Sequence, residues 1–313
     1  MMQLTTLANG LKVATREMPG VETAAVGLYA DTGSRHEPAR VNGIAHLFEH
    51  MVFKGAGGRS VLGDEASIEA ITVEDLHDWR QGQYRAGSLA LVAAGKVDHA
   101  ALVALAEARF GDLPTGTIPA PDPARFTGGD RVGRTSSDQA HLALAFGGPA
   151  QLDADYFAAR LFADAVGGGM SSRLFQQLRE ERGLAYTVYA SLSPYRDLGL
   201  FSVYAATARR QSVPAAQLIE EVLADAAESL TQRELDRVRT QARAGLLMSL
   251  ESPWGQAHYV ARQLSVHGRL VEPGEVVAEL AAVTLEQTRA AGARMLAGPR
   301  ARATIGFPAV RAA

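Results

Sequence analysis

Apolar residues in the first hundred positions come in short alternating runs, a pattern that predicts strands. Two runs, 3–7 and 11–16, flank Asn9-Gly10, a dipeptide typical of a tight hairpin turn. A third alternating run covers 23–30, and an almost wholly apolar run covers 88–95. We therefore expect a small sheet that includes one buried strand.

Two helices are predicted in this half from their starting residues. Thr72 with Asp75 forms a capping-box pattern, which predicts a helix from Val73 to about residue 81. Asp98 is suited to cap a helix that runs to about residue 110. Both starts place a side-chain oxygen where it can accept hydrogen bonds from the first free N–H groups.

The stretch 113–130 is rich in Pro and Gly and is typical of a linker between domains. We place the domains at 1–115 and 131–313, with 116–130 as the linker. The second half is expected to contain strands at 141–146, 184–192, 200–206 and 303–307, and helices at 154–166, 171–182 and in several segments from 213 to 295. Strands and helices grouped in this way favour an α+β fold over a doubly wound parallel sheet.

Composition limits the possible chemistry. The 313 residues favour two domains, and 47% hydrophobic with 21% charged residues is the balance of a globular protein. A net charge of −3 gives no sign of a nucleic-acid partner. No basic and apolar leader and no membrane-length apolar run is present, so we expect a cytoplasmic location without a membrane partner. The absence of cysteine leaves only His, Asp and Glu to hold a metal.

The strongest chemical signal is His46-Leu47-Phe48-Glu49-His50, which has the order H-x-x-E-H. On a helix, His46 and His50 lie one turn apart on the same face, with Glu49 beside them. Two neutral imidazoles can hold a Zn²⁺ ion while the carboxylate reaches the attacking water. The alternative is an amphipathic helix with two histidines on its polar face.

A second group of residues lies between 167 and 189. Gly167-Gly168-Gly169 precedes a predicted helix, and without a phosphate-binding motif we interpret it as a hinge, which argues against nucleotide chemistry. Arg179 and Tyr186 lie near the following helix–strand corner and could hydrogen-bond a substrate carbonyl or a developing oxyanion. The alternative is a solvated arginine and an ordinary strand tyrosine.

Taken together, these segments resemble the pitrilysin/insulinase family of zinc metallopeptidases, in particular its bacterial branch similar to the mitochondrial processing peptidase. The resemblance extends over nearly the whole chain. The matching blocks are 32–37, 43–55, 62–84, 167–189, 249–252 and 268–269.

The resemblance implies two related α+β domains, each an antiparallel sheet packed with helices, that close like a clam shell around a peptide or unfolded protein. His46 and His50 would be Zn²⁺ ligands, and Glu49 would be the general base. Arg179 and Tyr186 would reach the substrate from the second domain. Completing the site would then need two domains to close, or two chains, as a homodimer or as a heterodimer with a related peptidase.

One departure from the family stands out. The third zinc ligand of the family is a glutamate on a later helix, and about a hundred residues that would include it are missing near Ser60–Val61, which shortens the first domain. Glu65, Glu69 or Glu74 could replace that ligand. The sequence therefore supports two hypotheses: a zinc endopeptidase, or a catalytically impaired partner subunit of an active homologue.

Overall fold

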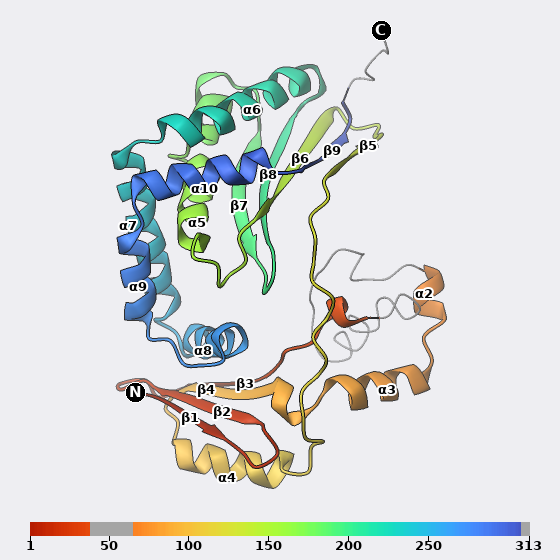
Figure 1. Cartoon of the computed structure of the whole chain (residues 1–313), viewed down its shortest axis with the longest axis vertical. Coiled ribbons are helices and arrows are strands. Elements are labelled where there is room, and N and C mark those ends of the chain that lie inside the picture. The colour runs from red at the N-terminus through yellow and green to blue at the C-terminus, as the bar shows by residue number, and fades with distance from the viewer. Residues whose placement is uncertain (38–64, 308–313) are drawn as a thin grey trace. The chain divides into compact units, whose positions relative to one another are not determined.

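The computed structural model describes residues 1–37 and 65–307 (Figure 1). Contacts divide the chain into two compact units, of which unit 1 holds Met1–Asp122 with Met248–Val271, and unit 2 holds Pro123–Leu247 with Glu272–Ala313. The domain boundaries given above stay a prediction. These contacts also show that the units are not continuous in sequence, because a segment from late in the chain packs into the first unit.

Unit 1 contains a four-stranded sheet, called sheet 1, with the order β1-β2-β4-β3. Its strands are β1 (Met2–Thr6), β2 (Lys12–Glu17), β3 (Ala24–Ala30) and β4 (Leu89–Gly95). The predicted hairpin is confirmed, since β1 and β2 pair antiparallel, and Gly10 in the turn has a φ of 98° that suits glycine. The parallel pairing of β2 with β4 departs from the expected all-antiparallel sheet.

The helices of unit 1 include two that begin where their predicted capping residues lie. They are α2 (Glu65–Glu69), α3 (Val73–Gln83), α4 (His99–Phe110) and α8 (Pro253–His267), with 3₁₀ turns η1 (Ser34–His36) and η3 (Ala86–Ser88). Thr72 and Asp75 form the complete capping box of α3. The Asp98 side chain accepts a hydrogen bond from the Ala101 N–H at the start of α4.

Helices cover both faces of sheet 1. One face packs against α4 through a cluster of buried residues: Leu11, Val13, Leu89, Leu91, Ala93, Leu102 and Ala106. The other face packs against α8 through Ala14, Val92, Ala94, Ala257, Val260, Ala261 and Leu264. The α8 residues recur at helical spacing, so one apolar stripe meets the sheet.

Unit 2 contains a five-stranded sheet, called sheet 2, with the order β5-β9-β6-β8-β7. Its strands are β5 (Gly129–Gly133), β6 (Gln139–Gly148), β7 (Thr187–Pro194), β8 (Gly199–Ala208) and β9 (Arg300–Ile305). All neighbours are antiparallel except β5 and β9. The expected start of β7 at residue 184 is wrong, because the Leu184 N–H still bonds to the Leu178 carbonyl of the preceding helix.

The helices of unit 2 include α5, α6 and α10, which lie on one face of sheet 2 as Figure 1 shows. They are α5 (Tyr156–Gly167), η4 (Phe175–Glu181), α6 (Ser212–Ser229), α7 (Gln232–Ser249), α9 (Pro273–Ala282) and α10 (Leu285–Ala297), with the 3₁₀ turn η5 (Arg209–Gln211). Phe162 on α5 and Phe201 on β8 are fully buried at the centre of this core, with ring centroids 6.0 Å apart. The two sheets packed with helices confirm the predicted α+β fold.

Candidate functional site

The zinc motif lies outside the described residues. His46, Glu49 and His50 fall in 38–64, as does the junction at Ser60–Val61. The structure therefore bears on the part of the predicted site that the second half of the chain supplies, namely Arg179 and Tyr186, and on the carboxylates that follow the junction.

The triple glycine permits a close approach of helix and strand. A Cβ added to Gly167, at the end of α5, would lie 2.2 Å from the backbone nitrogen of Ala190 on β7. Any side chain would therefore push the helix away from the sheet. At this position glycine serves close packing, which differs from the hinge that the sequence indicated, whereas Gly169 has open space around it.

Arg173 anchors the helix that follows. Its side chain is only 12% exposed, and its Nε and Nη2 donate to the two carboxylate oxygens of Glu234 at 2.6 and 2.8 Å. Its Nη1 also donates to Asp225 at 2.7 Å and to the Ser229 hydroxyl at 2.8 Å. Bidentate pairing of this kind fixes position and orientation. Arg173 thus ties the start of the helix to the corner between α6 and α7.

The anchored Glu234 carboxyl is strongly acidic. Burial raises its pKa, but hydrogen bonds from Arg173 and Thr231 outweigh that effect and bring the pKa from 4.5 down to about 2. The carboxylate therefore stays ionised over the whole neutral range, and the anchor persists there.

The helix predicted over 171–182 is present, but most of it is not an α-helix. Residues Phe175–Glu181 form a π-helix, η4, a rare conformation that is found frequently at functional sites. Leu174 and Leu178 are fully buried and hold η4 on the core. Gly183, with a φ of 59°, turns the chain toward β7.

Arg179 projects from η4 with its side chain 49% exposed. Its guanidinium carbon lies 4.8 Å above the Phe175 ring, and its Nε is 4.0 Å from the Glu180 carboxylate, too far for a hydrogen bond. The guanidinium is thus oriented by a ring, while its donors remain available. This is the opposite of Arg173, whose donors are consumed within the fold.

Tyr186 lies directly before β7. Its N–H donates to the Ala206 carbonyl at 2.8 Å, which fixes the backbone, and 60% of the residue is exposed. Within residues 1–37 and 65–307, its hydroxyl has no hydrogen-bond partner. Arg179 and Tyr186 therefore flank one helix–strand corner as exposed donors, although the structure shows no bond between them.

Sequence reasoning missed a polar aromatic cluster on the exposed face of sheet 2. His141 Nδ1 lies 2.8 Å from the Tyr204 hydroxyl, and the rings of Tyr204 and Tyr189 are 5.3 Å apart. The three side chains come from β6, β8 and β7, and Tyr189 stands directly opposite Tyr204 in the register. The alternation of each strand was visible in the sequence, but the pairing that joins them was not.

The chemistry of the predicted zinc ligands suits the metal. Two imidazoles and a carboxylate are suitable zinc ligands by their chemistry. In the described part of the chain, no three His, Asp or Glu residues gather closely enough to hold a metal. Glu65 and Glu69 on α2 and Glu74 on α3 are exposed and form no such group. A third ligand is therefore not identified.

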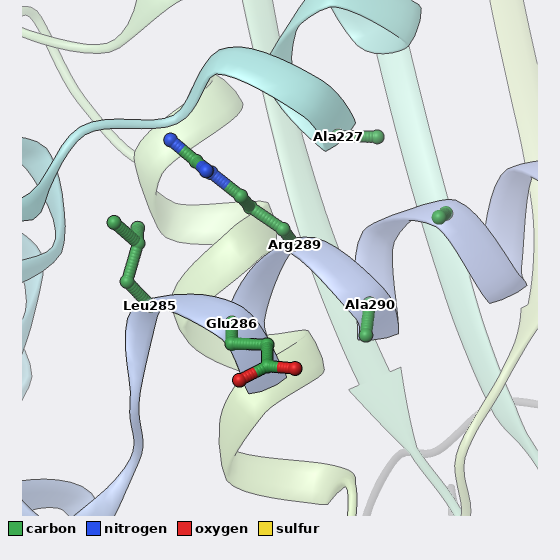
Figure 2. A pocket seen from close by; sticks show the side chains of 6 residues that line it. Ala227, Leu285, Glu286, Arg289 and Ala290 are labelled. Atoms are coloured by element: carbon green, nitrogen blue, oxygen red, sulfur yellow. The ribbon is translucent and has the colours of Figure 1, made fainter.

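One groove of about 480 Å³ lies beside α6 and α10 in unit 2 (Figure 2). Arg289 and Glu286 extend from α10 in different directions along it. The Nε of Arg289 donates to the Leu230 carbonyl at 2.9 Å, so the guanidinium caps the C-terminus of α6. This groove lacks a group of convergent polar side chains, and we do not place the site there.

Of the helices that the structure describes, none is long and apolar enough to cross a membrane.

Two family models match adjoining parts of the chain. Residues 12–74 match the model described as insulinase, peptidase family M16, and residues 70–242 match the model described as peptidase M16 inactive domain. Among curated relatives, an uncharacterized zinc protease of Mycobacterium leprae is 27% identical over 394 positions, covering 93% of this chain and 88% of the relative. One from Rickettsia bellii is 27% identical and covers 87% of this chain and 89% of the relative.

Solved structures share the fold. A peptidase M16 inactive domain from Pseudomonas fluorescens superposes with a TM-score of 0.88 at 20% identity and covers all of both chains. A protease from Helicobacter pylori gives a TM-score of 0.85 at 17% identity, covering 98% of this chain and 99% of that one.

The alignment with the Mycobacterium leprae protein also measures what this chain lacks. Since 93% of 313 residues is about 291, about 100 of the 394 aligned positions have no counterpart in this chain. That length equals the size of the deletion inferred from the sequence. Its location near Ser60–Val61 stays a prediction.

Proposed function

Because the chain belongs to the insulinase family of M16 peptidases, we propose that it is a zinc-dependent endopeptidase, with His46 and His50 as the metal ligands. Bound zinc would supply Lewis-acid chemistry at the scissile carbonyl. Glu49 would take a proton from the attacking water and deliver it to the leaving amine. The substrates that this chemistry suits are peptides or unfolded proteins.

The observation that carries the proposal is the contrast between two arginines on one helix. Arg173 is buried and bound to Glu234, whereas Arg179 is exposed with its donors available. A rigid anchor followed by a free guanidinium is the arrangement that a substrate-binding group requires. Tyr186, beyond the same helix, adds an exposed hydroxyl on a residue whose backbone N–H bonds to the Ala206 carbonyl. Both side chains can donate to a carbonyl that gains negative charge.

Hydrolysis of an unfolded protein by the purified full chain tests this function. We expect chelation to stop cleavage and Glu49→Gln to abolish it. Arg179→Lys and Tyr186→Phe should each lower kcat about 100-fold, the effect of removing one oxyanion donor. Arg182→Ala is the matched control, because Arg182 is about equally exposed on the next turn. Its Nη1 donates to the Gln177 carbonyl at 3.3 Å and lies 3.9 Å from the Glu181 carboxylate. Equal losses in Arg182→Ala and Arg179→Lys would contradict the proposed role.

A second candidate function is a catalytically impaired subunit that works with an active relative. The specific observation in its favour is the loss of about 100 aligned positions, within which the third ligand of the family is expected. A site with two histidines would hold zinc more weakly than one with three protein ligands. On this hypothesis the chain alone cleaves nothing, and activity appears only when it is mixed with a related peptidase. Arg179→Ala should then reduce the activity of the mixture, and an unchanged mixture would exclude a contribution from this corner.

A further inference from the structure

In the part of the chain that the structure describes, strand β3 is an edge of sheet 1, and its own sequence lacks the residues that usually protect an edge strand. Its sequence, Ala-Ala-Val-Gly-Leu-Tyr-Ala over 24–30, contains no charge and no proline. Natural proteins protect edges with charged residues or proline, because the unpaired backbone groups would otherwise recruit another strand. The edges of sheet 2 follow this rule: β5 carries Asp130 and Arg131, and β7 ends in Pro194.

The register identifies which backbone groups of β3 are unpaired. The Asp31 N–H bonds to the Ser88 carbonyl, and the Lys96 N–H bonds to the Thr23 carbonyl. In an antiparallel pair these bonds alternate along the strand, so the odd-numbered residues of β3 face β4. The N–H and C=O groups of the even-numbered residues, Ala24, Val26, Leu28 and Ala30, point away from the sheet. Among the described residues, they have no backbone partner on that side.

The side chains at this edge are apolar and exposed. Val26 is 55% exposed and Leu28 is 46% exposed. Val26 stands opposite Ala93 and Leu28 stands opposite Leu91 of β4, so both side chains lie on the same face of the sheet as α4. On that face α4 packs against β4, whereas Val26 and Leu28 at the edge stay exposed. We propose that β3 pairs antiparallel with β3 of a second copy of this chain, in a register centred on Gly27.

The strand is complementary to itself in that register. A two-fold axis through Gly27 places Val26 opposite Leu28 of the partner subunit, and Ala24 opposite Ala30 of the partner subunit. Each of these pairs joins residues whose backbone groups point outward, so the hydrogen-bonding ladder closes without a shift. The four side chains at positions 26 and 28 then form one apolar cluster, and no like charges meet.

Gly27 suits the centre of this interface. The central pair is not hydrogen-bonded, which is where opposite strands approach most closely. A Cβ on Gly27 would lie 2.7 Å from Cε2 of Tyr29, whose ring already occupies that side of the strand. Two glycines therefore let the backbones meet beneath the two tyrosine rings. The same absence of charge makes a second copy a better match than a charged peptide.

The test is the oligomeric state of the full chain, measured by light scattering and sedimentation at micromolar concentrations. We expect the unaltered chain to be a dimer, and Leu28→Lys and Val26→Glu to be monomers, because each puts two charges into the apolar cluster. Leu4→Lys is the matched control, since Leu4 is 37% exposed on β1, the other edge of the same sheet. It should remain a dimer. Fluorescence of buried Trp79 verifies that each variant has folded unit 1.

Mixing the two monomeric variants tests the register. Val26→Glu and Leu28→Lys chains should associate with each other, because the register places the introduced carboxylate directly opposite the introduced ammonium while the second Val26–Leu28 pair is unchanged. A mixture that stays monomeric overturns the register. A monomeric unaltered chain, or a dimer that Leu28→Lys leaves intact, overturns the proposal. None of these positions belongs to the zinc motif, so zinc content should be equal in all variants, and the interface can fail independently of the peptidase proposal.

Discussion

Sheet 1 and sheet 2 differ in how many of their faces are covered by helices. Sheet 1 has helices on both faces, α4 on one and α8 on the other. Sheet 2 packs one face against α5, α6 and α10, while the opposite face carries Tyr189, which is 48% exposed, and its partner Tyr204. The second unit thus gathers most of its buried residues in one deep core, whereas the first divides a smaller number between two thin layers.

This comparison distinguishes parts of the fold that form from neighbouring residues and parts that need contacts with distant segments of the chain. Unit 1 is completed only by 248–271, a segment that follows most of unit 2 in the sequence. Sheet 2, in contrast, keeps side chains such as Tyr189 exposed on the face that α5, α6 and α10 do not cover.

The largest effect should come from the core of sheet 2. Phe201 is fully buried between the rings of Phe146 and Phe162, so Phe201→Ala should lower the free energy of unfolding by about 4 kcal/mol. Tyr189→Ala, on the opposite face of the same sheet, should cost about 1 kcal/mol. Urea denaturation followed by circular dichroism measures both. Equal costs would contradict the one-sided burial of sheet 2.

The second test concerns the helix that completes unit 1. Leu264 on α8 is 3% exposed, and Leu264→Ala should lower the stability of unit 1 by about 3 kcal/mol. Both tryptophans, Trp79 and Trp254, belong to unit 1, so fluorescence follows this unit alone. Leu105→Ala is the control, because Leu105 on α4 is 54% exposed. If the two variants melt alike, α8 does not stabilise sheet 1.

A smaller effect is expected at the anchor of η4. Arg173→Lys keeps the charge but loses the bidentate geometry toward Glu234, and should lower the stability of unit 2 by about 2 kcal/mol. The substitution should also increase the rate of hydrogen exchange more in 173–181 than in β6. Unchanged protection of η4 would show that Arg173 does not position it.

The last effect is a pH dependence that appears only in acid solution. The Glu234 carboxyl has a pKa lowered from 4.5 to about 2, so its contribution to stability is complete above pH 4.5 and disappears as the pH falls toward 2. The unaltered chain should therefore lose stability between pH 4.5 and 2 more steeply than Glu234→Gln. Circular dichroism melts at several pH values measure the two slopes, and parallel curves would refute the assignment.

Local features of this fold were predictable from the sequence, because each depends on a few neighbouring residues. The β1–β2 hairpin follows from Asn9-Gly10, and the start of α3 follows from Thr72 and Asp75. The helical stripe of α8 was equally visible, but nothing in the spacing of its apolar residues states which sheet it covers. The parallel neighbours β2 and β4 are likewise joined by contacts between residues far apart in the chain.

The candidate site also contains features that depend on neighbouring residues and features that depend on residues far apart in the chain. The resemblance of short contiguous motifs predicts His46, Glu49, His50, Arg179 and Tyr186 as site residues, and their roles stay a prediction. The burial of Arg173 could not be predicted, since its partners Asp225 and Glu234 come from the corner of two later helices. The π-helix was hidden as well, because its apolar positions fit an α-helix.

Zinc content is the most direct measure of the central claim. The unaltered chain, Glu49→Gln and His50→Gln can be purified in parallel and analysed for bound zinc by elemental mass spectrometry. Our account predicts about one zinc ion per chain in the first two and none in the third, because an imidazole of the motif binds the metal whereas the glutamate acts on water. Equal zinc content in all three, including none at all, would contradict it.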